Sequence, residues 1–122
     1  MPGGLSEDDG ADAARALLDL PADRRPTAVT VFNDRCATGV LHVLRDAGVA
    51  VPGGTSVVGF DDSRLARLSH VDLTTIAQDA ARMTELAVAR AVARLDGPVP
   101  GEREQVVAPR LVVRGTTAPP PP

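Results

Sequence analysis

The apolar and polar positions along the chain follow two different periods, one typical of helices and the other of buried strands. Apolar residues that recur every three or four positions predict helices at about 6–20, 34–47 and 79–96. A β-branched, mostly apolar run predicts a strand covered on both faces at 27–32, and two more strands are predicted at 55–60 and 73–77. Two further short strands are predicted on either side of Pro109, at 105–108 and 111–114.

Residues with known end preferences mark where these helices begin and end. Ser6, followed by acidic residues, and Asn33 stand where side chains cap helix N-termini. Gly48 and Gly97 stand where helices end, and Gly48 is expected in the left-handed conformation. A short helical turn is expected around residues 64–68.

The order of elements predicts the fold class. A strand, a helix and a second strand follow one another between residues 27 and 60, so these two strands should lie parallel with a right-handed crossover. The class is therefore α/β, with an open parallel sheet like that of flavodoxin. The first four residues and the proline-rich tail at 118–122 are expected to be flexible.

Composition narrows the range of functions. The 122 residues suffice for one domain, and the net charge of −3 without a basic stripe disfavours DNA binding by the chain alone. All thirteen positive residues are arginine, which excludes Gly-Lys-Ser/Thr phosphate loops and Schiff-base lysines. Only two aromatic residues, Phe32 and Phe60, are present for stacking on a base or sugar. The single cysteine, the acidic start without a secretory signal and the absence of a long apolar run predict a cytoplasmic protein.

Polar residues follow each predicted parallel strand, at the edge of the sheet where such folds bind ligands. They are Asn33, Asp34, Asp61, Asp62 and Gln78. Carboxylates accept two hydroxyl protons and an amide both donates and accepts, which suits a neutral polyol better than a phosphate. Each residue also has a structural interpretation: a helix cap, an acid favoured by the helix dipole, a turn former or a strand end.

The sequence contains few residues that support a catalytic function. His42 and His70 lack metal-ligand spacing, and His42 is interpreted as a surface or interface residue. Cys36 has no base beside it in the sequence and is interpreted as a small buried residue. The Asp61–Asp62 pair could bind Mg²⁺ or accept a phosphoryl group, but no lysine or further strand-end acid supports this. We therefore expect no enzymatic activity, no cofactor and no metal ion.

Several short motifs occur in an ordered series with consistent spacing. They are Pro26-Thr-Ala-Val, Asn33-Asp34, Ala37-x-Gly39, Leu44-Arg45-x-Ala47-Gly48, Val51-Pro52, Ser56-Val-Val-Gly-Phe-Asp-Asp62, Leu73-Thr-Thr-Ile, Gln78 and Leu111-Val-Val-Arg-Gly-Thr-Thr117. The series resembles the C-terminal part of the effector-binding core of LacI/GalR-type transcription regulators, over nearly the whole chain.

The resemblance implies a periplasmic-binding-protein-like fold of two lobes around a sugar or nucleoside site. It implies that Asp34 and Gln78 contact the effector, while Asn33 and Asp61 stand at site positions with a mainly structural role. It also implies a dimer surface on the helix over residues 36–45. The exposed contact residues expected there are Thr38, Leu41, His42 and Arg45.

The resemblance sets the expected domain organisation. Residues 1–117 would form part of an effector-binding and dimerisation domain, with 78–108 as the segment that crosses to the other lobe and back. The helix-turn-helix head of the family is not found in the sequence, so DNA would be reached only through such a head. We expect a homodimer, with the crossing elements exchanged or simply paired, and weak effector binding by the chain alone. The alternative is a sugar-binding module related to transport proteins, with no DNA role.

Overall fold

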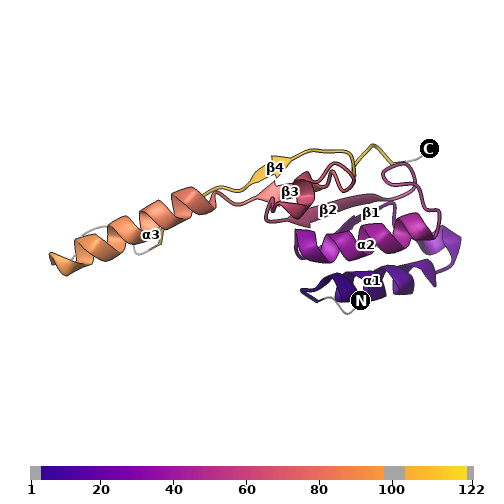
Figure 1. Ribbon diagram of the computed structural model, residues 1–122, viewed down its shortest axis with the longest axis horizontal. Helices are drawn as coiled ribbons and strands as arrows, with labels where there is room; N and C mark the ends of the chain where they lie inside the picture. The colour runs from indigo at the N-terminus through magenta and orange to yellow at the C-terminus, as the bar shows by residue number, and fades with distance from the viewer. Residues whose placement is uncertain (1–3, 98–103, 121–122) are drawn as a thin grey trace. The chain divides into compact units, whose positions relative to one another are not determined.

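The computed structural model describes residues 4–97 and 104–120 (Figure 1). The chain divides into two compact units, one formed by the residues up to Ala77 together with those from Leu111 onward, the other by Gln78–Arg110. The helices are α1 (Glu7–Leu18), α2 (Asp34–Asp46) and α3 (Ala80–Leu95), with short 3-10 turns η1 (Ala22–Arg24) and η2 (Leu65–Arg67). The strands are β1 (Ala28–Thr30), β2 (Ser56–Phe60), β3 (Thr74–Ala77) and β4 (Arg110–Val112).

The four strands form one sheet in the order β1-β2-β3-β4. β2 pairs with β1 and with β3, in parallel both times, with Val29 opposite Val57 and Gly59 opposite Thr75. The predicted parallel α/β class is confirmed. β2 and β3 begin one residue later than predicted, and β1 covers only Ala28–Thr30 of the predicted 27–32. The prediction that this strand is covered on both faces is wrong, because Ala28 and Thr30 are exposed and Val29 is only half-buried.

The first unit is layered, with α2 packed on the sheet and α1 packed on α2 (Figure 1). Leu41 and Leu44 of α2 meet Val57 and Leu73 in the core, and all four are almost completely buried. Two glycines let the helices approach closely. A Cβ atom at Gly10 would collide with the carbonyl of Cys36, and one at Gly39 would collide with the carbonyl of Glu7.

The helix ends agree with the capping predictions. Ser6 accepts a hydrogen bond from the Asp9 amide, and Asp9 in turn accepts from the Ser6 amide, which completes a capping box. Gly48 has a φ of +74°, the left-handed conformation expected at the end of α2.

The strand predicted at 105–108 is wrong. Residues 104–109 have no regular structure, and the strand near Pro109 begins at Arg110 instead. The described part of the second unit offers no neighbouring strand to pair with residues 105–108, and extended backbone without a partner is not stabilised.

The tail starts later than predicted. The Ser56 hydroxyl donates to the Ala118 carbonyl at 3.2 Å and accepts from the Ala118 amide at 3.1 Å, so Ala118 is anchored to β2. Pro119 and Pro120 are exposed, while 121–122, like 1–3 at the other end, lie outside the described residues.

The second unit consists mainly of α3, which Asp79 caps by accepting from the Arg82 amide. None of the described α3 side chains is buried, and its apolar residues Val88, Val92 and Leu95 are 54–85% exposed. No helix in the described part of the chain is long and apolar enough to cross a membrane.

Candidate functional site

Asn33 stands at the carboxyl end of β1, directly before α2. Its side-chain oxygen accepts from the Cys36 amide at 2.7 Å, so it caps the helix as the sequence predicted. Its amide nitrogen donates to the Leu5 carbonyl at 3.2 Å, which ties the start of α1 to the start of α2. Both hydrogen bonds give Asn33 a structural role at the edge of the site.

Asp34, the first residue of α2, points inward and is only 1% exposed. One carboxylate oxygen accepts from the Thr75 hydroxyl and the other from the Ser63 amide, both at 2.6 Å. Gly59 makes room for this carboxylate, because a Cβ atom there would collide with it. Asp34 therefore joins α2 to β3 and to the loop after β2, and the direct ligand contact that the resemblance implied for it stays a prediction.

The loop after β2 carries two consecutive residues with positive φ, Asp61 at 107° and Asp62 at 50°. Aspartate tolerates this conformation better than most residues, which agrees with a local backbone role for the pair, while ligand binding by it stays a prediction. The Asp61 amide donates to the Ile76 carbonyl at 2.9 Å, and the Asp61 side chain is exposed. The loop thus presents Asp61 at the carboxyl end of the sheet.

Asp62 holds this loop to the end of the chain. Its carboxylate accepts from Arg114 at 2.6 Å and from Arg67 at 2.7 Å. Burial by itself raises the pKa of Asp62, but the hydrogen bonds and charges of Arg114 and Arg67 outweigh it and hold the pKa below its usual range. Arg114 also donates to the Leu73 carbonyl at 2.9 Å, so one guanidinium joins the loop to the segment before β3.

Gln78 follows β3 and is exposed. Its carbonyl accepts from the Ala80 amide at 2.8 Å, at the start of α3. Asn33, Asp34 and Asp61 lie in the first unit and Gln78 in the second, so the gathering of all four around one ligand stays a prediction.

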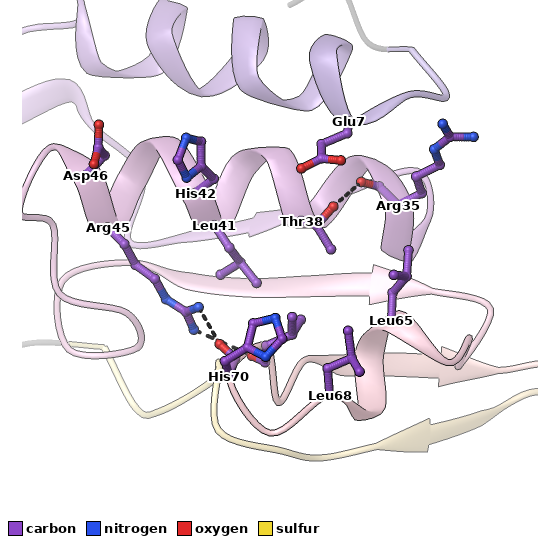
Figure 2. Close-up of a pocket in the computed structure, with 11 residues that line it drawn as sticks. Glu7, Arg35, Thr38, Leu41, His42, Arg45, Asp46, Leu65, Leu68 and His70 are labelled. Carbon is purple, nitrogen blue, oxygen red and sulfur yellow. Dashed lines mark hydrogen bonds between the residues drawn. The ribbon is translucent and has the colours of Figure 1, made fainter.

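A second candidate surface lies on α2, where the dimer contacts were predicted. Thr38, His42 and Arg45 line a cavity of about 660 Å³ between α2 and the segment around η2 (Figure 2). The other lining residues come from α1, α2 and residues 65–71, and are Glu7, Arg35, Leu41, Asp46, Leu65, Leu68, His70 and Val71. Arg45 donates to the His70 carbonyl at 2.7 Å, which fixes the floor of this cavity.

One of the four predicted contact residues differs from expectation. His42 and Arg45 are exposed and Thr38 is half-buried, but Leu41 is 2% exposed and belongs to the core. The exposure predicted for Leu41 is wrong, because its side chain packs inward with Ala37, Val40 and Leu44.

Cys36 is 4% exposed, which confirms its interpretation as a small buried residue. Burial, with the nearby charge of Asp9, raises the pKa of its thiol. Within the ranges that the structure describes, no three His, Cys, Asp or Glu side chains gather closely enough to hold a metal ion.

Sequence reasoning missed the partners of Asp34 and Asp62. Thr75 and Ser63 showed no polar signal beyond their place in a strand and a loop, and Arg114 lies 52 positions from Asp62. The only signal was the position of Arg114 in the last motif of the ordered series.

Known proteins resemble this chain in both sequence and fold. The chain matches the periplasmic binding protein-like domain family over residues 2–117. It is 38% identical to the HTH-type transcriptional regulator MalR of Streptomyces coelicolor over 109 residues, which are 89% of this chain and 30% of MalR. It is 37% identical to the ribose operon repressor of Escherichia coli, over 88% of this chain and 32% of the repressor. The chain therefore spans about a third of the length of these relatives.

Solved structures give the same result. The structure of a LacI transcriptional regulator from a Rhodococcus species is 51% identical, with a TM-score of 0.88 over 98% of this chain and 43% of that one. A LacI family regulator from Enterococcus faecium with bound ribose is 28% identical, with a TM-score of 0.83 over 97% of this chain and 42% of that one. With its parallel sheet, its capped α2 and the ordered motifs, the chain belongs to the periplasmic binding protein-like domain family, in the form carried by LacI-type transcriptional regulators.

Proposed function

We propose that this chain binds a neutral sugar effector and forms dimers as part of a LacI-type transcriptional regulator. The observation that carries the proposal is the polar edge formed by Asn33, Asp34 and Asp61, which lies where open parallel sheets bind ligands. A structure similar to this one, from Enterococcus faecium, contains ribose.

The side chains of the polar edge differ in how far they are exposed to solvent. Asp34 is 1% exposed, whereas the Asp61 side chain is exposed at the same edge of the first unit. A carboxylate can accept hydrogen bonds from two adjacent hydroxyl groups, as sugar recognition requires. We therefore place direct sugar contact in the first unit on Asp61, and the contact predicted for Gln78 of the second unit remains a separate proposal.

Affinity for a free sugar should be low. Each hydrogen bond contributes only about 0.5–1.5 kcal/mol net. The sum over a few such bonds is smaller than the entropic cost of binding a free ligand. We expect a dissociation constant on the order of 1 mM or weaker for the chain alone.

Titration of the ¹⁵N-labelled chain with ribose, followed by NMR, tests the site. Amide shifts confined in the first unit to the neighbourhood of Asp61 support it, and Asp61→Asn should reduce them. Asp23→Asn, an exposed change on η1, serves as the matched control. Shifts spread over α1 would contradict the proposed site. So would the absence of shifts at a ribose concentration 50-fold above the expected dissociation constant of about 1 mM.

Pairing is proposed through the α2 surface formed by Thr38, His42 and Arg45. This surface is exposed, mixed in charge and hollowed, so a second copy related by a two-fold axis could place side chains into it. The exposed apolar residues of α3 would be covered in the same assembly, by exchange or by simple pairing.

Sedimentation velocity at micromolar concentration tests the pairing. The wild-type chain should sediment as a dimer or larger species, and His42→Glu should weaken it by placing two like charges near the axis. Ala50→Glu adds the same charge at an exposed position away from α2 and should leave association unchanged. A monodisperse wild-type monomer would contradict this part of the proposal.

DNA contact is proposed to belong to the part of these regulators that the chain does not match. The net charge of −3 supports this, since phosphate neutralisation supplies most non-specific DNA affinity. The chain alone should leave a DNA duplex unshifted in a gel at 50 mM salt, and we propose that it acts in the cytoplasm without catalysing a reaction. A salt-sensitive shift would contradict this assignment.

A further inference from the structure

The loop after β2 has a conformation that its own residues do not favour. Asp61 has a φ of 107° and Asp62 a φ of 50°. Aspartate tolerates left-handed backbone better than most residues, but two such residues in a row are uncommon and persist only where tertiary contacts hold them. The direction of the Asp61 side chain therefore depends on the contacts that hold this loop.

Hydrogen bonds fix the loop on both sides of Asp62. The Asp61 amide donates to the Ile76 carbonyl at 2.9 Å, and the Ser63 amide donates to the Asp34 carboxylate at 2.6 Å. Between these two bonds, the Asp62 side chain is only 10% exposed and its carboxylate accepts from two arginines. The Asp62 carboxylate thus anchors the middle of the loop.

The two arginines differ in how firmly they can hold this carboxylate. Arg67 pairs with it at 2.7 Å, but the Arg67 side chain is 62% exposed and lies only five positions after Asp62 in the chain. Arg114 pairs with it at 2.6 Å, and the Arg114 side chain is 16% exposed. Exposed ion pairs contribute little, because solvent screens the charges and a long side chain loses freedom when it is held. Arg114 is therefore the main anchor of the loop.

Arg114 is itself fixed to β3. Its amide donates to the Thr74 hydroxyl at 2.8 Å, and its carbonyl accepts from the same hydroxyl at 3.1 Å. Thr74 is 2% exposed. The Arg114 guanidinium donates to the Leu73 carbonyl at 2.9 Å as well as to Asp62. Arg114 thus ties the loop to the start of β3.

We propose that Asp62 and Arg114 are positioning residues for the sugar effector: their ion pair holds the left-handed loop against β3 and thereby fixes the direction in which Asp61 meets the sugar. The inference rests on the sugar site proposed above. Neither residue has to touch the sugar, because the Asp62 carboxylate is engaged by the arginines. Without the pair, the loop can relax towards ordinary negative φ, which turns the Asp61 carboxylate away from its position in this structure.

Ribose titration of ¹⁵N-labelled variants of the full chain, followed by NMR, tests the proposal. Arg114→Met keeps the length of the side chain but removes the ion pair, and should raise the dissociation constant for ribose about fivefold, the effect of one lost hydrogen bond. Arg114→Lys keeps the charge and should recover most of this loss. Arg67→Met removes the exposed partner of the same carboxylate and should change the dissociation constant less than about twofold.

Two further measurements separate positioning from a general loss of stability. Gly39→Ala disturbs the contact between α1 and α2 rather than the loop, and should leave the dissociation constant of the folded chain unchanged. Without ribose, Arg114→Met should speed hydrogen exchange of the Asp61 amide about tenfold more than that of the Leu44 amide in α2. If Arg114→Met fails to fold, Arg114→Gln, which keeps a hydrogen-bond donor without the charge, replaces it in both measurements.

The outcomes distinguish this proposal from the sugar site on which it rests. Absence of ribose shifts in the wild-type chain would overturn both. Ribose binding that the Arg114 variants leave unchanged would overturn the positioning role alone. So would an equal effect of Arg67→Met or Gly39→Ala on the dissociation constant, or equal acceleration of exchange at Asp61 and Leu44.

Discussion

Replacing Asp34 with alanine should destabilise the first unit far more than replacing it with asparagine. Alanine removes the acceptor of two buried or half-buried donors, the Thr75 hydroxyl and the Ser63 amide. Asparagine has the same shape, and its oxygen can still accept from the Ser63 amide while its nitrogen donates to the Thr75 hydroxyl.

The magnitude follows from these contacts. A hydrogen bond to a charged group contributes about 1.5–3 kcal/mol, so losing both bonds should cost about 3–6 kcal/mol. A Cβ atom at Gly59 would collide with both the Asp34 carboxylate and Leu73, so the carboxylate lies in a closely packed place. Asparagine keeps two weaker neutral bonds and should cost about 1–2 kcal/mol. Since domains are typically stable by about 5–15 kcal/mol, the alanine variant should lose a large share of its stability.

Urea unfolding followed by circular dichroism at 222 nm measures both variants. A double-mutant cycle with Thr75→Val isolates the side-chain pair and should give a coupling of about 1–2 kcal/mol. If Asp34→Ala and Asp34→Asn cost the same small amount, below about 1 kcal/mol, the carboxylate does not hold the loop and the argument fails.

Three further predictions concern other contacts of the first unit. Since Arg114 and Arg67 lower the pKa of Asp62 in the folded chain, the stability from this cluster should be complete above the unfolded value of about 3.9 and decline as pH falls towards the folded value. Arg114→Met should flatten that part of an unfolding profile measured from pH 6 to pH 2; an unchanged slope would exclude the cluster as its source. Gly39→Ala should force α1 from α2 and cost about 1–3 kcal/mol in urea unfolding, whereas a neutral result would show that the helices can separate freely. The buried thiol of Cys36, with its raised pKa, should react slowly with iodoacetamide in buffer and rapidly in urea, and equal rates would contradict its burial.

The regular elements could be predicted because each depends on local signals. Ser6, Asn33 and Gly48 marked helix ends by capping preferences that act within one turn. Ala37, Leu41 and Leu44 follow the three- and four-residue spacing of the helix predicted at 34–47, which indicates that Leu41 lies on the apolar stripe of that helix. The error about Leu41 came from the resemblance, which named a helix surface without saying which residues of this chain face outward.

The contacts of the candidate site could not be predicted because they join distant positions. The burial of Asp34 depends on the missing side chain of Gly59, 25 positions away, and on the left-handed loop that brings the Ser63 amide back. The strand expected at 105–108 failed for the opposite reason. Its local pattern was favourable, but a strand also needs a neighbour, and no single-residue preference reports one.

The position of β4 next to β3 has a consequence for the cost of the connection between them. The chain leaves the sheet after Ala77 and returns at β4, the next strand in the sheet order, and Thr116 then hydrogen-bonds Val57. Topologically, the second unit is an insertion between two adjacent strands. Doubling the length of a flexible insertion adds only about 0.6 kcal/mol of closure entropy. A longer connection between Ala77 and Arg110 would therefore add little to the cost of closing the sheet at β3 and β4.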